Sequence, residues 1–151
     1  MNKVTRNQQV AILTLRLLLG FIFLMQGYGK VFTYTVNGIY NMGFCVDAYT
    51  AFPKILLLGT AYYTSYVELL AGLLLVLGLK RDYALYALAS VLVIVTFGHG
   101  YAEPIWDLSH VFYRSILLAA LLLLPSQWDR FSIDYYIGKD KTTLHDGFSE
   151  N

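Results

Sequence analysis

The chain has 151 residues, a length that suits one domain, and a net charge of +1. Hydrophobic residues make up 57% of it and charged residues only 14%, against roughly 25% charged in ordinary globular chains. The near-neutral charge argues against a nucleic-acid-binding surface, and the single cysteine, Cys45, excludes an intramolecular disulfide and a multi-cysteine metal cluster.

Four apolar segments approach the about 20 residues that cross a bilayer as a helix. In chain order they cover residues 10–32, 55–79, 83–101 and 108–124. The first is longer than a signal-peptide core and ends without a small-residue cleavage motif, so we expect it to remain as an anchor. The sequence therefore predicts an all-α fold, a membrane-embedded four-helix bundle. The alternative, a soluble bundle, would need polar stripes that these segments mostly lack.

The connections between the four segments differ in character. Residues 33–54 mix polar and aromatic side chains, which predicts a partly helical interfacial loop between the first two helices. Residues 80–82 predict a tight turn, and residues 102–107 a short link ending at Asp107, a residue type that caps helix N-termini. Residues 125–151 are mostly polar and predict a tail outside a bundle domain formed by residues 1–124.

Lysine and arginine residues gather on one side of the predicted bundle. Those of the N-terminus, the tight turn and the tail are Lys3, Arg6, Lys80, Arg81, Arg130, Lys139 and Lys141. The other side has only Lys30 and Lys54. Because such residues concentrate in cytoplasmic loops, we expect a multi-pass protein of a bacterial inner membrane with both termini in the cytoplasm.

Glu68 is the most informative polar residue within the predicted spans. It precedes Leu79 by eleven residues, about 16 Å along a helix, which places it near the bilayer centre. A lone carboxylate there would take up a proton, whereas a paired one stays charged. Its candidate partners are Arg16 of the first span and Arg114 of the fourth, and the sequence does not choose between them. The pair would serve either bundle packing or the handling of protons and ligands.

A second polar group is predicted at the opposite membrane surface from the termini. Its members are Gln26, Lys30, His99, Glu103, Asp107 and His110. Gln26 and Lys30 are four residues apart, as are His99 and Glu103, so each pair shares one helix face. We expect the group to line one polar pocket. No metal site is predicted, and His99, Glu103 and His110 are only weak candidates as metal ligands, because two histidines on separate helices form a permissive pattern.

Glycines recur along the first two spans. Gly20 and Gly27 are seven residues apart on nearly one face, and Gly72 follows Glu68 by one helical turn, with Gly78 further along. Small residues allow membrane helices to approach closely, so these four glycines predict tight helix packing.

Two motifs carry a resemblance to a known family. Residues 15–32, LRLLLGFIFLMQGYGKVF, contain the pattern R-L-x-x-G-x-x-F-x-x-x-G-x-x-K, and residues 67–79, VELLAGLLLVLGL, contain E-x-x-x-G-x-x-L-x-x-G. In this order and spacing they resemble the first and second helices of the DoxX-like family of four-helix membrane proteins, over about residues 10–124. The resemblance implies a four-helix membrane bundle associated with redox systems.

The function implied by this resemblance is that of an accessory subunit in a membrane redox or quinone-linked respiratory complex. Its partners would be the lipid bilayer and other membrane or periplasmic protein subunits. A quinone is the candidate cofactor, stacked on Tyr28, Tyr66 or Tyr101. A structural scaffold subunit and a small-molecule or lipid binding or transport module are the alternatives. The chain has no nucleophile–base pair or dense metal motif that would mark a standalone enzyme.

Overall fold

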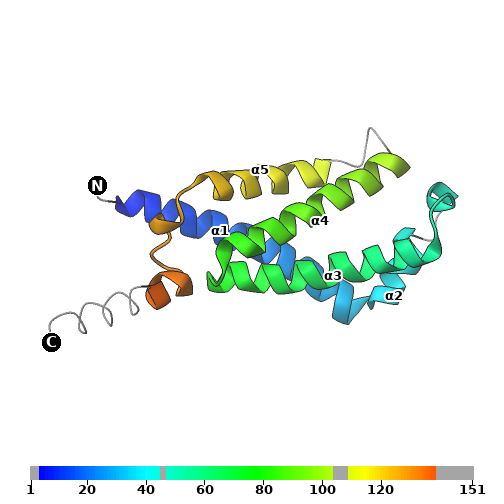
Figure 1. Cartoon of the computed structure of the whole chain (residues 1–151), viewed down its shortest axis with the longest axis horizontal. Helices are drawn as coiled ribbons and strands as arrows, with labels where there is room; N and C mark the ends of the chain where they lie inside the picture. Colours follow the sequence, from blue (N-terminus) through cyan, green and yellow to red (C-terminus); the bar gives the residue numbers. More distant parts are fainter. Residues whose placement is uncertain (1–3, 45–46, 104–108, 139–151) are drawn as a thin grey trace, which may run out of the picture.

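The computed structural model describes residues 4–44, 47–103 and 109–138, and the regular elements within these ranges are all helical. The four long helices of Figure 1 are α1 (Arg6–Tyr28), α3 (Lys54–Leu77), α4 (Arg81–Ala102) and α5 (Ser109–Leu123). The predicted all-α bundle is therefore confirmed. Of the four, α1, α3 and α4 are long and apolar enough to cross a membrane, whereas α5 has 15 residues and is shorter.

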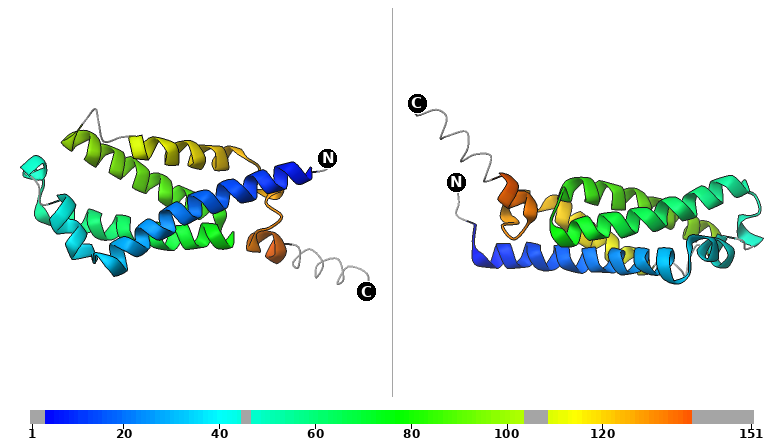
Figure 2. Two further views of the ribbon diagram at one scale, coloured as in Figure 1. Left: turned by 180° about the vertical axis from the view of Figure 1, so that it is seen from behind. Right: turned by 90° about the horizontal axis from the view of Figure 1, so that it is seen from below.

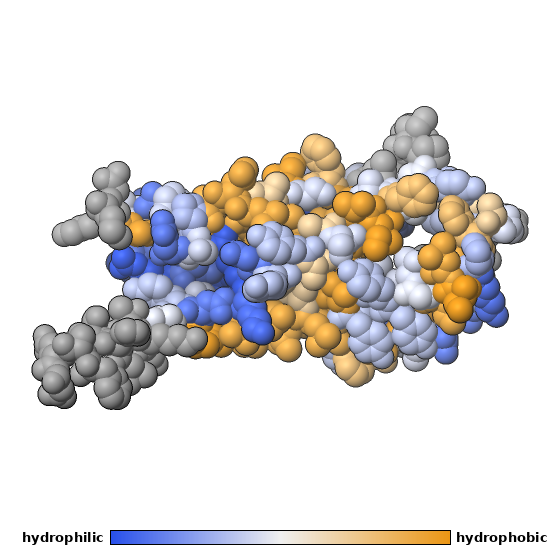
Figure 3. All heavy atoms as spheres, viewed as in Figure 1, coloured by the Kyte–Doolittle hydropathy of each residue, from blue (hydrophilic) through white to orange (hydrophobic). Residues whose placement is uncertain are grey.

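The outer surface of the bundle is apolar. Large hydrophobic side chains are exposed on each long helix, among them Leu18 on α1, Leu70 on α3, Val93 on α4 and Ile116 on α5. Figure 3 shows apolar residues over the middle of one face and a concentration of polar residues at the end where α1 begins. Because water disfavours such a large apolar surface, this exterior fits a hydrocarbon environment.

The first helix begins earlier than its hydrophobic run, at a capping box. Thr5 accepts a hydrogen bond from the backbone nitrogen of Gln8, and the side chain of Gln8 accepts one from the backbone nitrogen of Thr5, at 2.8 Å. This reciprocal pair satisfies two backbone donors that a helix N-terminus otherwise leaves unpaired. The helix therefore starts at Arg6, four residues before the predicted span.

Helix α1 packs most extensively on α3 and crosses it obliquely (Figure 2). A Cβ atom added to Gly27 would fall on the backbone of Leu69, and one added to Gly72 would fall on the backbone of Leu24. A Cβ atom on Gly20 would lie 2.9 Å from the side chain of Val76. The three contacts share one antiparallel register, in which each step toward the start of α1 is matched by a step toward the end of α3.

The connection from α1 to α3 is partly helical, as predicted. It contains a π-helical turn at Gly29–Thr33, the short helix α2 (Val36–Ile39), a second π-helical turn at Tyr40–Phe44 and a 3-10 turn at Asp47–Tyr49. Val36 and Tyr40 are buried and pack against Ala61 of α3. This contact holds the connection against one end of the bundle.

The residues after α5 fold back onto the bundle instead of forming only a polar tail. A 3-10 turn at Ser126–Trp128 is followed by Asp129, which is 1% exposed, and by a helical segment at residues 133–138. Gly78 ends α3 in the left-handed conformation with a φ of 68°, and a Cβ atom there would lie 2.6 Å from the Cβ atom of Ser132. The C-terminal segment thus docks where only glycine fits.

Candidate functional site

Arg16, one of the two candidate partners of Glu68, does not pair with it and lies beside Asp129 instead. Its Nε lies 3.0 Å from Oδ2 of Asp129. Its other nitrogens donate to the carbonyl oxygens of Leu75 (2.5 Å), Val76 (2.9 Å) and Phe131 (3.2 Å). The register of α1 on α3 explains this result, because it sets Arg16 beside the C-terminal end of α3, where the last carbonyl groups lack helical partners.

Asp129 completes this buried cluster outside the spanning helices. Burial raises the pKa of the Asp129 carboxyl above its ordinary value, and the nearby charges of Arg16 and Arg81 oppose that rise. Arg81 donates to the carbonyl oxygens of Leu121 and Leu124 at the end of α5. Arg16 therefore holds the C-terminal end of α3, and Arg81 holds the C-terminal end of α5. Both arginines have a structural role.

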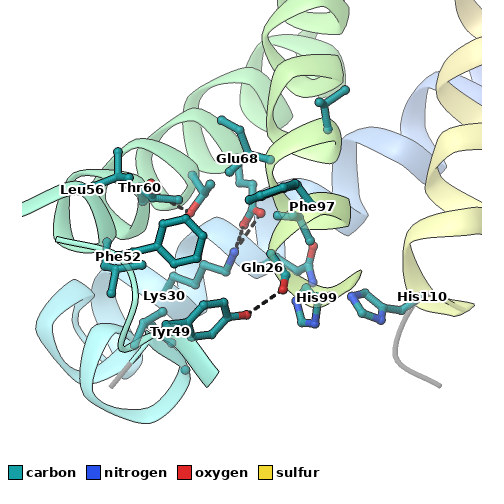
Figure 4. A pocket seen from close by; sticks show the side chains of 18 of the residues that line it. Gln26, Lys30, Tyr49, Phe52, Leu56, Thr60, Glu68, Phe97, His99 and His110 are labelled. Carbon is teal, nitrogen blue, oxygen red and sulfur yellow. Dashed lines mark hydrogen bonds and ion pairs between the residues drawn. The ribbon is translucent and has the colours of Figure 1, made fainter. Parts of the chain in front are cut away.

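Glu68 pairs instead with Lys30. The lysine Nζ lies 2.8 Å from Oε1 and 2.7 Å from Oε2 of Glu68. The glutamate side chain is 1% exposed and that of the lysine is 24% exposed. Lys30 stands in the π-helical turn that extends α1, and its side chain reaches back toward α3, as Figure 4 shows. The long, flexible lysine side chain thus brings a positive charge further into the bundle than its own backbone lies.

Arg114, the other expected partner, lies close to this pair but contacts an aromatic ring. Its guanidinium carbon is 5.9 Å from the ring centroid of Phe23 on α1. Among the residues that the structure describes, Arg114 forms no direct ion pair. The second expected arginine is thus also replaced by Lys30 as the direct partner of Glu68.

A cavity of about 710 Å³ lies at the end of the bundle where α1 stops and α3 begins. The polar and charged side chains that line it are Gln26, Lys30, Tyr49, Thr60, Thr64, Glu68, His99, His110 and Arg114. It therefore joins the predicted intramembrane carboxylate to four members of the predicted outer pocket. Glu103 is exposed at the end of α4 and does not line the cavity, and Asp107 lies outside the described residues.

His99 and His110 both line the cavity and pack against each other edge to face, with ring centroids 4.8 Å apart and planes inclined by 76°. Within the described ranges, no group of three histidine, cysteine or carboxylate residues is arranged to hold a metal ion. The weak metal candidates His99, Glu103 and His110 are thus not brought together as a set. The two imidazoles contribute polar groups to the wall of the cavity.

Another part of the cavity wall is apolar and aromatic, and most of it is not predicted by the sequence. Tyr49 donates from its hydroxyl to the carbonyl oxygen of Gly98 at 2.9 Å. Phe52 packs edge-on against Phe97 at 6.4 Å and against Tyr101 at 5.1 Å. These contacts attach the α1–α3 connection to α4. The only available signal was the aromatic character of residues 33–54.

The three tyrosines predicted to stack on a flat ligand do not line the cavity. Tyr28 is half exposed and packs on Phe32, and Tyr66 is partly exposed and packs on Tyr62. Tyr101 supports the cavity indirectly, through Phe52. The aromatic surface available to a ligand belongs to Tyr49, Phe52 and Phe97.

The charges and hydrogen-bonding groups of the cavity are unevenly matched. Lys30 and Arg114 bring two cations, and Glu68 brings one carboxylate. The side-chain oxygen of Gln26 is buried and has no hydrogen-bond partner among the described residues. A buried acceptor without a partner is costly, so the cavity suits a ligand or water that donates to it.

Apolar helices with a polar cavity turned inward define a multi-pass helical membrane protein. The DoxX family model matches residues 11–100, from α1 through most of α4, and the chain belongs to the DoxX family. No curated protein and no solved structure matches the sequence.

Proposed function

We propose that this DoxX-family protein is an accessory subunit of a quinone-linked redox complex in a bacterial inner membrane, and that its cavity binds the quinone head group. The cavity carries this proposal, because it combines a polar floor with aromatic walls. Binding sites for small molecules are mostly apolar with a few placed polar groups, and their volumes lie within roughly 300–1,000 Å³. At about 710 Å³, the cavity has the size of such a site.

The residues present fit a quinone and its reduced form. A quinone offers carbonyl oxygens that accept hydrogen bonds, and a quinol offers hydroxyl groups that donate them. Arg114 supplies donors, and the unpartnered oxygen of Gln26 supplies an acceptor. Phe52 and Phe97 supply apolar surface for a flat ring. A bound quinone would bring the capacity to accept electrons and protons.

The Lys30–Glu68 pair forms the charged floor of the proposed site. Glu68 is held deep in the bundle and faces the cavity, where its carboxylate oxygens stand ready to hold a proton. Lys30 stands in direct contact with that carboxylate and supplies a positive charge beside it. We therefore propose that Glu68 handles protons for the bound head group, with Lys30 as its counter-charge.

The proposed partner is a second protein subunit that supplies or removes electrons. The cavity is lined by residues from the end of α1, the start of α3 and the end of α4. These parts of the helices lie at the end of the bundle away from the start of α1 and the C-terminal segment (Figure 1). The basic residues Arg6, Lys80, Arg81 and Arg130 at the other end support a cytoplasmic location for both termini, and the cavity would then open at the periplasmic surface.

Native purification followed by quinone extraction tests the proposal. We expect the protein, purified from its own membranes in mild detergent, to carry quinone and an oxidoreductase subunit. Glu68→Gln should lower the affinity for an alkyl-benzoquinone by about tenfold, the loss of about 1.4 kcal/mol of binding free energy. Ser65→Ala is the matched control, because Ser65 is buried one turn away on α3, and its hydroxyl donates to the carbonyl oxygen of Ala61 and, within the described ranges, to no cavity residue.

Two results would overturn the proposal. The first is a pure, folded protein that retains no quinone, binds none on titration and copurifies with no oxidoreductase. The second is solute flux through reconstituted protein that depends on Glu68 while quinone binding is absent, which would support the transport alternative.

A further inference from the structure

Several residues that line the cavity also lie on the lipid-facing surface. Val93 is 69% exposed, Phe97 is 63% exposed and Leu56 is 54% exposed, yet each of them borders the cavity. Val93 precedes the end of α4 by nine residues, about 14 Å along the helix. The cavity thus reaches the outer surface of the bundle deep within the hydrocarbon region, as well as near its end.

Two contacts made with α4, one from α3 and one from the α1–α3 connection, mark where this opening lies. Tyr63 of α3 and Ser90 of α4 form a hydrogen bond of 2.7 Å on one side of Val93. The Phe52–Phe97 contact lies on the other side. Between Ser90 and Phe97 the helix rises by about 10 Å, which is wider than one hydrocarbon chain.

The two helices diverge in this region. They are joined by a tight turn at one end and separate toward the other in Figure 1. The space-filling view in Figure 3 is hollowed between them near the end where α3 begins. We call this opening the lateral window and define it by Leu56, Val93 and Phe97, with the Tyr63–Ser90 bond as its inner limit.

We infer that the lateral window is the path by which the single hydrocarbon tail of a quinone-type lipid leaves the cavity for the bilayer. This inference rests on the proposed function. The polar head group is retained by Gln26 and Arg114, while the tail needs an apolar exit. Each methylene group left in water costs about 0.8 kcal/mol relative to burial, so a tail that left through the aqueous end of the bundle would weaken binding steadily with its length. A ligand bound in this way is therefore a lipid whose tail stays dissolved in the membrane.

Blocking the window tests this inference. Val93→Trp adds a large side chain at its edge, and its outward position makes the change tolerable for folding. Tyr86→Trp is the matched control, because Tyr86 is 60% exposed on the same helix, two turns away, and does not line the cavity. The probes are a decyl-substituted benzoquinone and the same benzoquinone without the chain. Protein in lipid nanodiscs is equilibrated with each probe, and the retained probe is extracted and measured.

We expect Val93→Trp to lower retention of the decyl probe by about tenfold, with retention of the chain-free probe unchanged. Tyr86→Trp should resemble the wild type with both probes. Leu56→Trp, which blocks the window from α3, provides a second variant if Val93→Trp is not monodisperse on size exclusion.

Each contrary outcome has a distinct meaning. Unchanged retention of the decyl probe in both window variants, or equal loss of both probes, would overturn the window while leaving quinone binding intact. Recovery of a two-chain phospholipid from the cavity in place of quinone would overturn the tail assignment. Failure of the wild-type protein to retain either probe would overturn the proposed function and the window together.

Discussion

Lys30 and Glu68 form one ion pair but occupy unequal environments. The glutamate is almost fully buried, whereas a quarter of the lysine side chain is exposed. Removing one partner of a buried pair leaves the other without compensation, and the penalty depends on how well that remaining charge can reach water. The two ends of this pair are therefore not equivalent.

Lys30→Met should destabilise the protein more than Glu68→Gln. The first change strands a carboxylate inside the bundle, at a cost of about 3–5 kcal/mol, whereas the second leaves a lysine that can turn outward. Thermal unfolding in detergent, followed by circular dichroism, measures both. The double variant should recover most of the stability lost in Lys30→Met. Equal losses in the two single variants would contradict this view of the site.

Helices α1 and α3 form a structural pair because their backbones touch. The contact at Gly27 and Gly72 has no room for a side chain, and it sets the register that places Arg16 at the end of α3 and Lys30 within reach of Glu68. In a membrane, close packing of this kind replaces the hydrophobic drive that joins helices in water.

Gly27→Ala and Gly72→Ala should each lower the free energy of unfolding by about 1–3 kcal/mol, since the added methyl group must push two backbones apart. Matched controls stand on the same segments. A Cβ atom at Gly29 or Gly59 would meet nothing within 4 Å, so alanine at either position should leave stability unchanged or slightly raised. The comparison uses unfolding in the same detergent. Equal losses at all four positions would mean that backbone contact is not the cause.

At the scale of the whole molecule, hydropathy predicted the helical bundle, and the mix of polar and aromatic residues predicted its partly helical connection. Those features depend on local composition, which a single sequence displays. The partner of Glu68 depended on how α1 crosses α3. By depth alone Arg16 and Arg114 were suitable, and Lys30 was assigned to the surface because its backbone lies there. A lysine side chain that reaches inward is not visible in a hydropathy pattern.

The cavity was predictable only in part. Gln26, Lys30, His99 and His110, which the sequence groups because they fall at one end of their helices, all line it. Tyr49 and Phe52 were missed because a connecting segment has no periodicity that shows which side chains turn inward. The docked C-terminal segment was missed for a related reason, since Asp129 appears in a polar stretch although it is buried against Arg16.

The orientation of the molecule in the membrane gives a further prediction. With Cys45 replaced by alanine, a cysteine introduced at the exposed position Asn41 should react with a membrane-impermeant maleimide on intact spheroplasts. One introduced at exposed Arg130 should react only after lysis. The reverse pattern would place the termini outside and would reject the orientation inferred from basic residues.

The turn between α3 and α4 has a mechanical consequence. Gly78 and Lys80 both adopt positive φ angles there, which reverses the chain within a few residues. The two helices are therefore joined at this turn and diverge away from it (Figure 1). Because α4 rises by about 1.5 Å per residue, a rotation of about 5° around the turn would shift the C-terminal end of α4 by roughly 3 Å. The hydrogen bond from Tyr49 to Gly98 connects the far end of α4 to the α1–α3 connection and so restrains the angle between α3 and α4.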